Sequence, residues 1–263
     1  MIRSLLALAL LTATSLSAHA VPLMPNFADV PTGWTTDRYE PNSFSNVGSY
    51  QGRANVLGIG ISSAQNAASR PLGQQSMFYN THGRQHAITG GAGSSLAADL
   101  FINASWGDSA KGNVRSDMWG VLLDSSPADG LTYPIIGFTN YGGGERYRVW
   151  DADTPLGWVD LATPVVHDAW TSFNINFTGT AFEYLINGAL VYTDTTTDSI
   201  EFTAVIMQAY NFGDPTNLPG AIATDYVAHW SNVQVAGVPE PGSIALLGLG
   251  LAGLGFSRRK RAS

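Results

Sequence analysis

Aromatic side chains beside expected turns are the residues of this sequence best suited to holding a ligand. Tyr141, Trp150, Trp158 and Tyr210 lie at or near the ends of expected strands, and their polar companions are Asn140, Asn211 and Asp214. Aromatic faces stack on sugar rings, while amide and carboxylate groups bond to hydroxyls. These residues predict a glycan-binding surface, although for any single ring a place in a hydrophobic core is the commoner outcome.

Two short acidic stretches have the composition of a metal-binding loop. Asp151 and Asp153, with Asp160 nearby, follow one expected strand, and Asp124 and Asp129 lie in another loop. Ca²⁺ prefers several oxygen ligands from such loops. Aspartates also cap turns through local hydrogen bonds, and this second interpretation is favoured. We therefore expect no cofactor, with Ca²⁺ at Asp151 and Asp153 as the alternative.

Sequence patterns of other catalytic chemistry are absent. The chain has no cysteine, which excludes thiol catalysis, disulfides and cysteine-ligated metals. No Gly-x-Ser-x-Gly, P-loop or dinucleotide-binding string occurs. His82 and His86 have the spacing of two ligands on a helix, but Gly83 and the glycines at 90 and 91 argue against a helix. We expect both to be exposed loop histidines.

The segments that must position these residues have the alternating pattern of short β-strands. Residues 182–186 and 189–193 are joined by Asn187-Gly188, the strongest short signal for a hairpin. A second hairpin is expected to join 135–140 to 146–151. Further strands are expected at 56–61, 96–102, 119–123, 173–177, 202–210 and 226–235. Many short strands separated by Gly, Pro and Asn predict an all-β antiparallel sandwich.

Residues 21–236 are long enough for one domain with a single core. They contain eight basic and nineteen acidic residues, for a net charge near −11, and Lys111 is their one lysine. All tryptophans and tyrosines of the chain lie in this stretch. The charge balance disfavours binding of nucleic acid through its phosphates.

The first 20 residues have the features of a secretory signal peptide. Arg3 precedes an apolar run at 5–11, and Ala18 and Ala20 form a small-x-small site that predicts cleavage after Ala20. A retained membrane anchor is the alternative, which the short apolar run disfavours.

Residues 237–263 contain an apolar segment, 244–256, whose helix would rise about 20 Å, less than a hydrocarbon core of roughly 30 Å. We expect a short transmembrane helix with a cytoplasmic basic end. The triplet Pro239-Glu240-Pro241 precedes it, and the basic residues that follow it are Arg258, Arg259, Lys260 and Arg261. This arrangement resembles the PEP-CTERM sorting domain. The resemblance implies an exported protein, held transiently in the inner membrane until an exosortase processes it near the triplet. It then reaches the cell surface or extracellular matrix, often in bacteria that make exopolysaccharide.

A second resemblance lies in the middle of the chain. The stretch 170–194, with a Trp-led strand, a strand ending in Asn-Gly and an apolar return, is similar to concanavalin A-like and laminin-G-like jelly rolls, as is the closing stretch 226–235. The resemblance implies a jelly-roll sandwich over residues 21–236.

That fold hosts lectins and glycoside hydrolases alike, and the hydrolases need two close carboxylates. Laminarinase-like members carry them as Glu-x-Asp-x-Glu, a string that this chain lacks. The glutamates between residues 21 and 236 are widely separated, at Glu40, Glu145, Glu183 and Glu201. We therefore expect no enzymatic activity, and predict a glycan-binding module associated with exopolysaccharide. The alternative is a structural matrix protein without a defined ligand.

Overall fold

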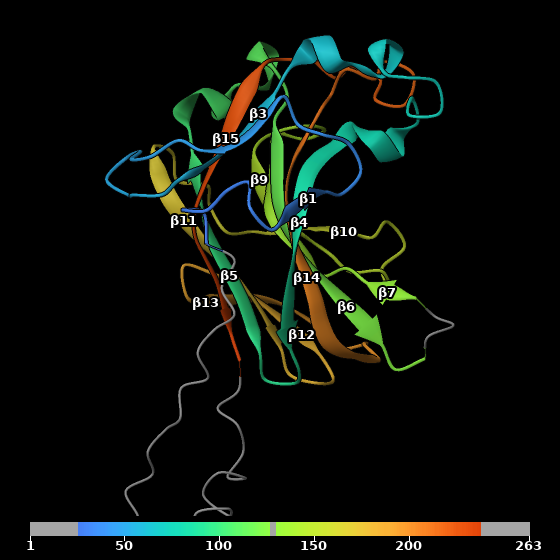
Figure 1. Cartoon of the computed structure of the whole chain (residues 1–263). Helices are drawn as coiled ribbons and strands as arrows, with labels where there is room; N and C mark the ends of the chain where they lie inside the picture. The colour runs from blue at the N-terminus through green and yellow to red at the C-terminus, as the bar shows by residue number, and fades with distance from the viewer. Residues whose placement is uncertain (1–25, 127–129, 238–263) are drawn as a thin grey trace, which may run out of the picture. The chain divides into compact units, whose positions relative to one another are not determined.

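Two antiparallel β-sheets packed face to face form the part of the chain that the computed structural model describes, residues 26–126 and 130–237 (Figure 1). The eight-stranded sheet contains, in order, β1 (Trp34–Thr36), β4 (Thr81–Gly90), β14 (Ser199–Tyr210), β6 (Arg115–Asp124), β8 (Ile135–Thr139), β9 (Arg146–Trp150) and β10 (Trp158–Asp160), and β7 (Leu131–Thr132) pairs with β6. The seven-stranded sheet contains, in order, β13 (Ala189–Asp194), β12 (Phe182–Ile186), β11 (Ala169–Phe177), β5 (Ser95–Ile102), β15 (Tyr226–Ala236), β3 (Leu57–Ile61) and β2 (Ser43–Asn46).

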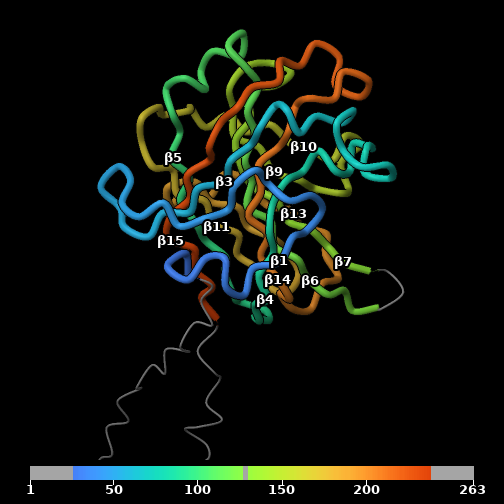
Figure 2. Tube along the Cα trace, turned by 45° about the horizontal axis from the view of Figure 1, so that its top comes forward, coloured from blue at the N-terminus to red at the C-terminus, as the bar shows by residue number. Residues whose placement is uncertain are grey.

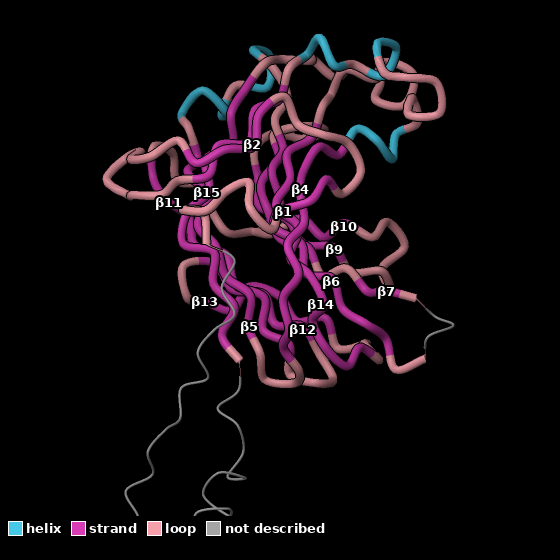
Figure 3. The backbone as a smooth tube through the Cα atoms, in the orientation of Figure 1, coloured by secondary structure: helices cyan, strands magenta, loops and turns pink. Residues whose placement is uncertain are grey.

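The helical turns of the described residues are short 3₁₀ segments in loops at one end of the sandwich, drawn in cyan in Figure 3. They are η1 (Ser63–Gln65), η2 (Ala67–Ser69), η3 (Met77–Asn80), η4 (Ala104–Gly107) and η5 (Ser109–Lys111). No helix within 26–126 or 130–237 has the length and apolar character needed to cross a membrane.

The core lies between the sheets because each strand buries alternate residues on its inner face. On β11, Phe173, Ile175 and Phe177 point inward. Trp230 of β15 is fully buried, and its indole Nε1 donates to Ser116 Oγ of the opposite sheet at 2.8 Å. Strands distant in sequence meet at the centre of the eight-stranded sheet, where β14 pairs with both β4 and β6 (Figures 1 and 2).

The antiparallel β-sandwich expected from the sequence is confirmed. The hairpin at Asn187-Gly188 is present, with φ of +51° and +80° at its two central residues. The signal peptide, its cleavage site at Ala18 and Ala20, and the C-terminal helix all lie outside the described residues.

The expectation that His82 and His86 lie in an exposed loop is wrong. Both lie on β4, and His82 is fully buried. Gly83 interrupts the strand pattern in the sequence but fits in its middle, because a Cβ there would approach the Met207 carbonyl oxygen of β14 to 2.5 Å. Burial, with a smaller contribution from the neighbouring positive charge of Arg70, lowers the pKa of His82 to about 3, so the ring is neutral at physiological pH.

Candidate functional site

An apolar row of side chains crosses the outer face of the eight-stranded sheet. The pairing register aligns one residue from each of five adjacent strands, and these are Ile206, Trp119, Ile135, Trp150 and Trp158. They form a hydrophobic cluster separate from the core between the sheets. Register thus brings together side chains from β14, β6, β8, β9 and β10.

A polar row lies beside the apolar one, because residues two positions along each strand share the same face. It consists of Gln208, Asp117, Gly137, Arg148 and Asp160. The buried Asp117 Oδ2 accepts hydrogen bonds from Gln208 Nε2 and from Arg115 Nε, both at 2.5 Å. Gly137 is required beside it, since a Cβ there would collide with Asp117 Oδ1 and approach its Cα to 2.6 Å.

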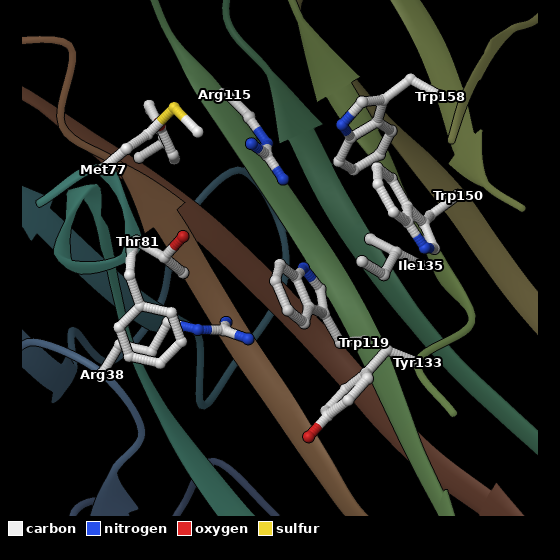
Figure 4. Close-up of a pocket in the computed structure, with 11 residues that line it drawn as sticks. Arg38, Met77, Thr81, Arg115, Trp119, Tyr133, Ile135, Trp150 and Trp158 are labelled. Carbon is white, nitrogen blue, oxygen red and sulfur yellow. The ribbon is translucent and has the colours of Figure 1, made fainter. Parts of the chain in front are cut away.

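A pocket of about 400 Å³ opens over the apolar row. Its lining residues are Arg38, Met77, Phe78, Thr81, Arg115, Trp119, Tyr133, Ile135, Trp150, Trp158 and Tyr210. In Figure 4, Arg115 and Trp119 rise from the middle strand, with Met77, Thr81 and Arg38 on one side and Trp150 and Trp158 on the other. This volume and mainly apolar lining are typical of small-molecule sites.

Three guanidinium groups stack on the aromatic rings of the pocket. Arg38 lies 4.3 Å from the Trp119 ring centroid. Trp158 contacts two of the groups, Arg115 at 4.5 Å and Arg148 at 3.8 Å. Such contacts between a cation and a ring hold the guanidinium planes in fixed positions. The stacking makes the pocket both aromatic and positively charged.

Two of the three tryptophans that line the pocket are partly exposed, whereas Trp119 is buried. Trp150 and Trp158 are half-buried, and their rings meet edge to face at 73° with centroids 5.1 Å apart. The ring of Trp150 packs against Gly157, whose φ is +71°. The two rings therefore present differently oriented faces to the pocket rather than one coplanar platform.

The remaining predicted binding residues lie elsewhere. Asn140 and Tyr141 line a second pocket of about 370 Å³, but the Asn140 side chain is buried and donates to the carbonyls of Trp106 and Gly112. Asn211 and Asp214 are also buried. Of the seven candidates, the structure brings together Trp150, Trp158 and Tyr210 in the first pocket.

The acidic loop after β9 gains a third carboxylate from a distant strand. One oxygen each of Asp151, Asp153 and Asp194 lie within 4.8 Å of one another. The oxygens also serve the local structure, because Asp151 Oδ1 accepts from the Asp153 amide at 2.9 Å and Asp151 Oδ2 from the Tyr192 hydroxyl at 2.6 Å. The hydrogen bond to Asp151 and, to a lesser extent, burial raise the pKa of Tyr192 to about 12. Calcium at this loop stays a prediction.

The other acidic residues considered in the sequence lie apart from this trio. Asp124 accepts from Thr132 and Ser199, Asp160 pairs with Arg146 at 2.7 Å, and Asp129 lies outside the described residues.

Sequence reasoning missed the centre of the pocket. Arg115, Asp117 and Trp119 lie on the outer face of β6, but every residue from 115 to 122 is buried, so no alternation of burial marks that face. The expected strand began at Trp119, so its charged half was not recognised. Arg38 carries no such signal either, because it reaches the pocket from a loop preceding β2.

Comparison with known families and structures identifies a sorting motif and solved structures that are similar to the sandwich. Residues 237–260 match the family model of the PEP-CTERM protein-sorting motif, as expected from Pro239-Glu240-Pro241 and the basic end. The motif implies export to the cell surface and processing by an exosortase. No curated protein sequence matches the chain.

The sandwich is similar to solved jelly-roll glucanases. A Bacillus licheniformis β-glucanase is 16% identical over 80% of this chain and 95% of that chain, with a TM-score of 0.45. A prokaryotic β-1,3-1,4-glucanase (lichenase) from a mouse hindgut metagenome is 13% identical over 81% and 97%, with a TM-score of 0.47. An immunostimulatory antigen and pseudo β-1,3-glucanase of Mycobacterium tuberculosis is 13% identical over 79% and 92%, with a TM-score of 0.44. At these identities the likeness concerns the fold.

The expectation of no enzymatic activity is contradicted by this likeness. Solved structures similar to the chain include two β-glucanases, so enzymes use this sandwich. The missing Glu-x-Asp-x-Glu string was too narrow a criterion, since carboxylates can also meet across strands.

Proposed function

We propose that this chain binds an extracellular polysaccharide in the pocket on the outer face of the eight-stranded sheet. The observation that carries the proposal is the extent of the pocket, whose lining runs from Thr81 on β4 to Trp158 on β10. These strands are five positions apart in the sheet, a span of roughly 24 Å at ~4.8 Å per strand. A groove of that length suits a chain of several sugars better than a single one.

The chemistry of the lining supports the same proposal. The half-buried rings of Tyr133, Trp150 and Trp158 offer faces for the apolar C–H surfaces of sugar rings. The hydroxyl of Thr81 and the guanidinium groups of Arg38 and Arg115 provide hydrogen-bonding partners at the edges of those rings.

We further propose the route by which the pocket reaches its ligand. The signal peptide is removed after Ala20, and residues 237–263 anchor the chain transiently in the inner membrane. An exosortase then cleaves near Pro239-Glu240-Pro241, and the released protein joins the exopolysaccharide at the cell surface or in the matrix. Mass spectrometry of the released protein tests this route, and a mature form that still ends in Arg258-Arg259-Lys260-Arg261 would contradict it.

The binding proposal is tested by applying the full chain, in mild detergent, to glycan arrays and to the producer's own polysaccharide and measuring its retention. Trp158→Ala should weaken binding about 30-fold, the ~2 kcal/mol of a binding hot spot. Trp170→Ala is the matched control, because Trp170 is also a half-buried tryptophan stacked under an arginine but lies on the seven-stranded sheet.

Two outcomes would count against the binding proposal. Equal losses in the Trp158→Ala and Trp170→Ala variants would remove the pocket as the site. A folded protein that no glycan retains would favour the structural matrix alternative.

A further inference from the structure

The pocket contains positive charge that the rest of the domain does not share. Residues 21–236 hold seven arginines and nineteen acidic residues. Three of those arginines, Arg38, Arg115 and Arg148, stack on aromatic rings that line the pocket. Three of the seven arginines of the domain therefore meet at one aromatic patch of the eight-stranded sheet.

These three guanidinium groups outnumber the carboxylates that pair with them. Arg38 Nη1 pairs with Asp37 at 3.0 Å, and Arg115 Nε pairs with Asp117 at 2.5 Å. Arg148 is only 9% exposed, and no described residue accepts a hydrogen bond from its Nε. The two carboxylates that attract it, Asp117 and Asp160, are already ion-paired with Arg115 and Arg146, so positive charge is in excess here among the described residues. A buried positive charge without a partner is unfavourable, and an anion in the pocket would offset it.

Donors are also directed into the pocket. Arg115 is 9% exposed and uses only its Nε for Asp117, so that no described residue accepts from its Nη atoms. Figure 4 shows its guanidinium reaching into the space between Met77 and Trp158. Stacking on Trp158 and on Tyr210, at 4.9 Å, fixes the plane of this group before any ligand arrives. A guanidinium held in this way suits the planar, two-point recognition of an oxyanion.

We propose that the polysaccharide of this pocket is an anionic one, whose carboxylate or sulfate groups are held by Arg38 and Arg115 while its ring faces stack on Trp150 and Trp158. The inference rests on the proposed function and names the class of its ligand. Arg148 stacks on the Trp158 ring at 3.8 Å and supplies the surplus positive charge.

The net negative charge of the domain does not prevent an anionic polysaccharide from binding in the pocket. Its net charge near −11 would repel a polyanion at a distance, but the Debye length is about 8 Å at physiological ionic strength. The two carboxylates of the polar row, Asp117 and Asp160, and Asp37 beside Arg38 are all paired with arginines. The local charge that a ligand meets in the pocket is therefore positive.

Two matched pairs of polymers test the inference with the full chain in mild detergent at 0.15 M salt. One pair is polygalacturonate and the same polymer after reduction of its carboxyl groups to alcohols, and the other is dextran sulfate and dextran. We expect at least one charged polymer to bind about ten- to a hundredfold more tightly than its neutral form, the effect of one or two charge-assisted hydrogen bonds. The pair that shows the difference identifies carboxylate or sulfate as the recognised group.

The possible failures are distinguishable. Equal binding within both pairs would overturn the inference and leave the proposed function standing. Absence of binding to all four polymers and to every other glycan of the array would overturn both.

Arginine variants locate the effect. Arg38→Gln should weaken binding of the charged polymer about tenfold more than it weakens binding of the neutral form. Arg53→Gln is the matched control, since Arg53 likewise stacks on a tryptophan and pairs with an aspartate, Asp99, but on the seven-stranded sheet. Arg115→Gln is the second variant, with its melting temperature measured alongside because Arg115 also supports Asp117. A preference that survives in Arg38→Gln and in folded Arg115→Gln would overturn the assignment.

Discussion

Replacing Arg148 by methionine should raise the stability of the fold. Arg148 is 9% exposed, its Nε has no acceptor among the described residues, and the carboxylates that attract it, Asp117 and Asp160, are ion-paired with Arg115 and Arg146. Burial is the main cause that lowers the pKa of Arg148 to about 9, and the neighbouring charge of Arg115 adds to it. The fold therefore disfavours the charged form of Arg148. Methionine has a similar length and packs well against an aromatic ring such as Trp158.

The magnitude follows from the removal of a buried charge. Replacing buried charges by apolar residues of similar volume stabilises proteins by about 1–4 kcal/mol when the site repacks. In a domain of this size, 1 kcal/mol shifts the melting temperature by roughly 2–4 °C. We therefore expect the Arg148→Met variant to melt several degrees above the wild type at pH 7, in calorimetry and in urea unfolding of the full chain.

The pH dependence of that difference tests the cause. Because the pKa of Arg148 is lower in the folded state than in the unfolded state, the folded state binds fewer protons in alkaline solution. The destabilisation by Arg148 is therefore complete below pH about 9 and is relieved as the pH rises above that value. The stability gap between Arg148→Met and wild type should narrow over this range.

Arg53→Met is the control with the opposite sign. Arg53 stacks on Trp170 at 4.5 Å, much as Arg148 stacks on Trp158, but it forms an ion pair with Asp99. Its removal leaves the buried Asp99 with a weaker set of partners and should destabilise the fold. A wild type more stable than Arg148→Met at pH 7 would refute the reasoning, since Arg148 would then have a partner in solution.

Two further perturbations probe the outer face and the acidic loop. Gly137→Ala should lower the free energy of unfolding in urea titrations by about 1–3 kcal/mol, because its Cβ would overlap Asp117. Gly91→Ala is the control and should have little effect, because the nearest atom to its Cβ would be 3.9 Å away. Burial is the main cause that raises the pKa of Asp194, and the charge of Asp151 raises it as well. Because the folded state binds this proton more tightly than the unfolded state, stability is lost as pH rises through the raised pKa. Asp194→Asn should therefore be more stable than wild type at pH 7 and equally stable at pH 3, and a gain of the same size at both pH values would contradict this cause.

The fold could be predicted from the sequence where alternation and turn chemistry agree. The hairpin at Asn187-Gly188 depended on two residues that tolerate positive φ, and the structure has positive φ at both. β4 was missed because its glycines resemble turn residues. Gly83 instead leaves room for the backbone of β14, a requirement set by a strand more than a hundred residues away.

The candidate site was harder to predict than the fold, for a reason of geometry. Alternation shows which residues of a strand share a face, but it does not fix the register between strands. Trp150 and Trp158 were recognisable as neighbours in sequence. Trp119 became their neighbour only through the pairing of β6 with β8 and of β8 with β9. The trio of Asp151, Asp153 and Asp194 was hidden in the same way, since Asp194 lies on a different sheet.

Charge that is unfavourable for stability is informative about binding when it lies in a pocket. Arg115 of β6 and Arg148 of β9 lie on strands separated by β8, and both stack on Trp158. A fold selected for stability alone would gain from a neutral side chain at one of these positions, as the Arg148→Met prediction states. If that variant is more stable and also loses its preference for a charged polymer, the surplus guanidinium is explained by the ligand. If the variant is more stable and binds the charged and neutral polymers as before, Arg148 does not contribute to binding. The anion-binding role then rests on Arg38 and Arg115 alone.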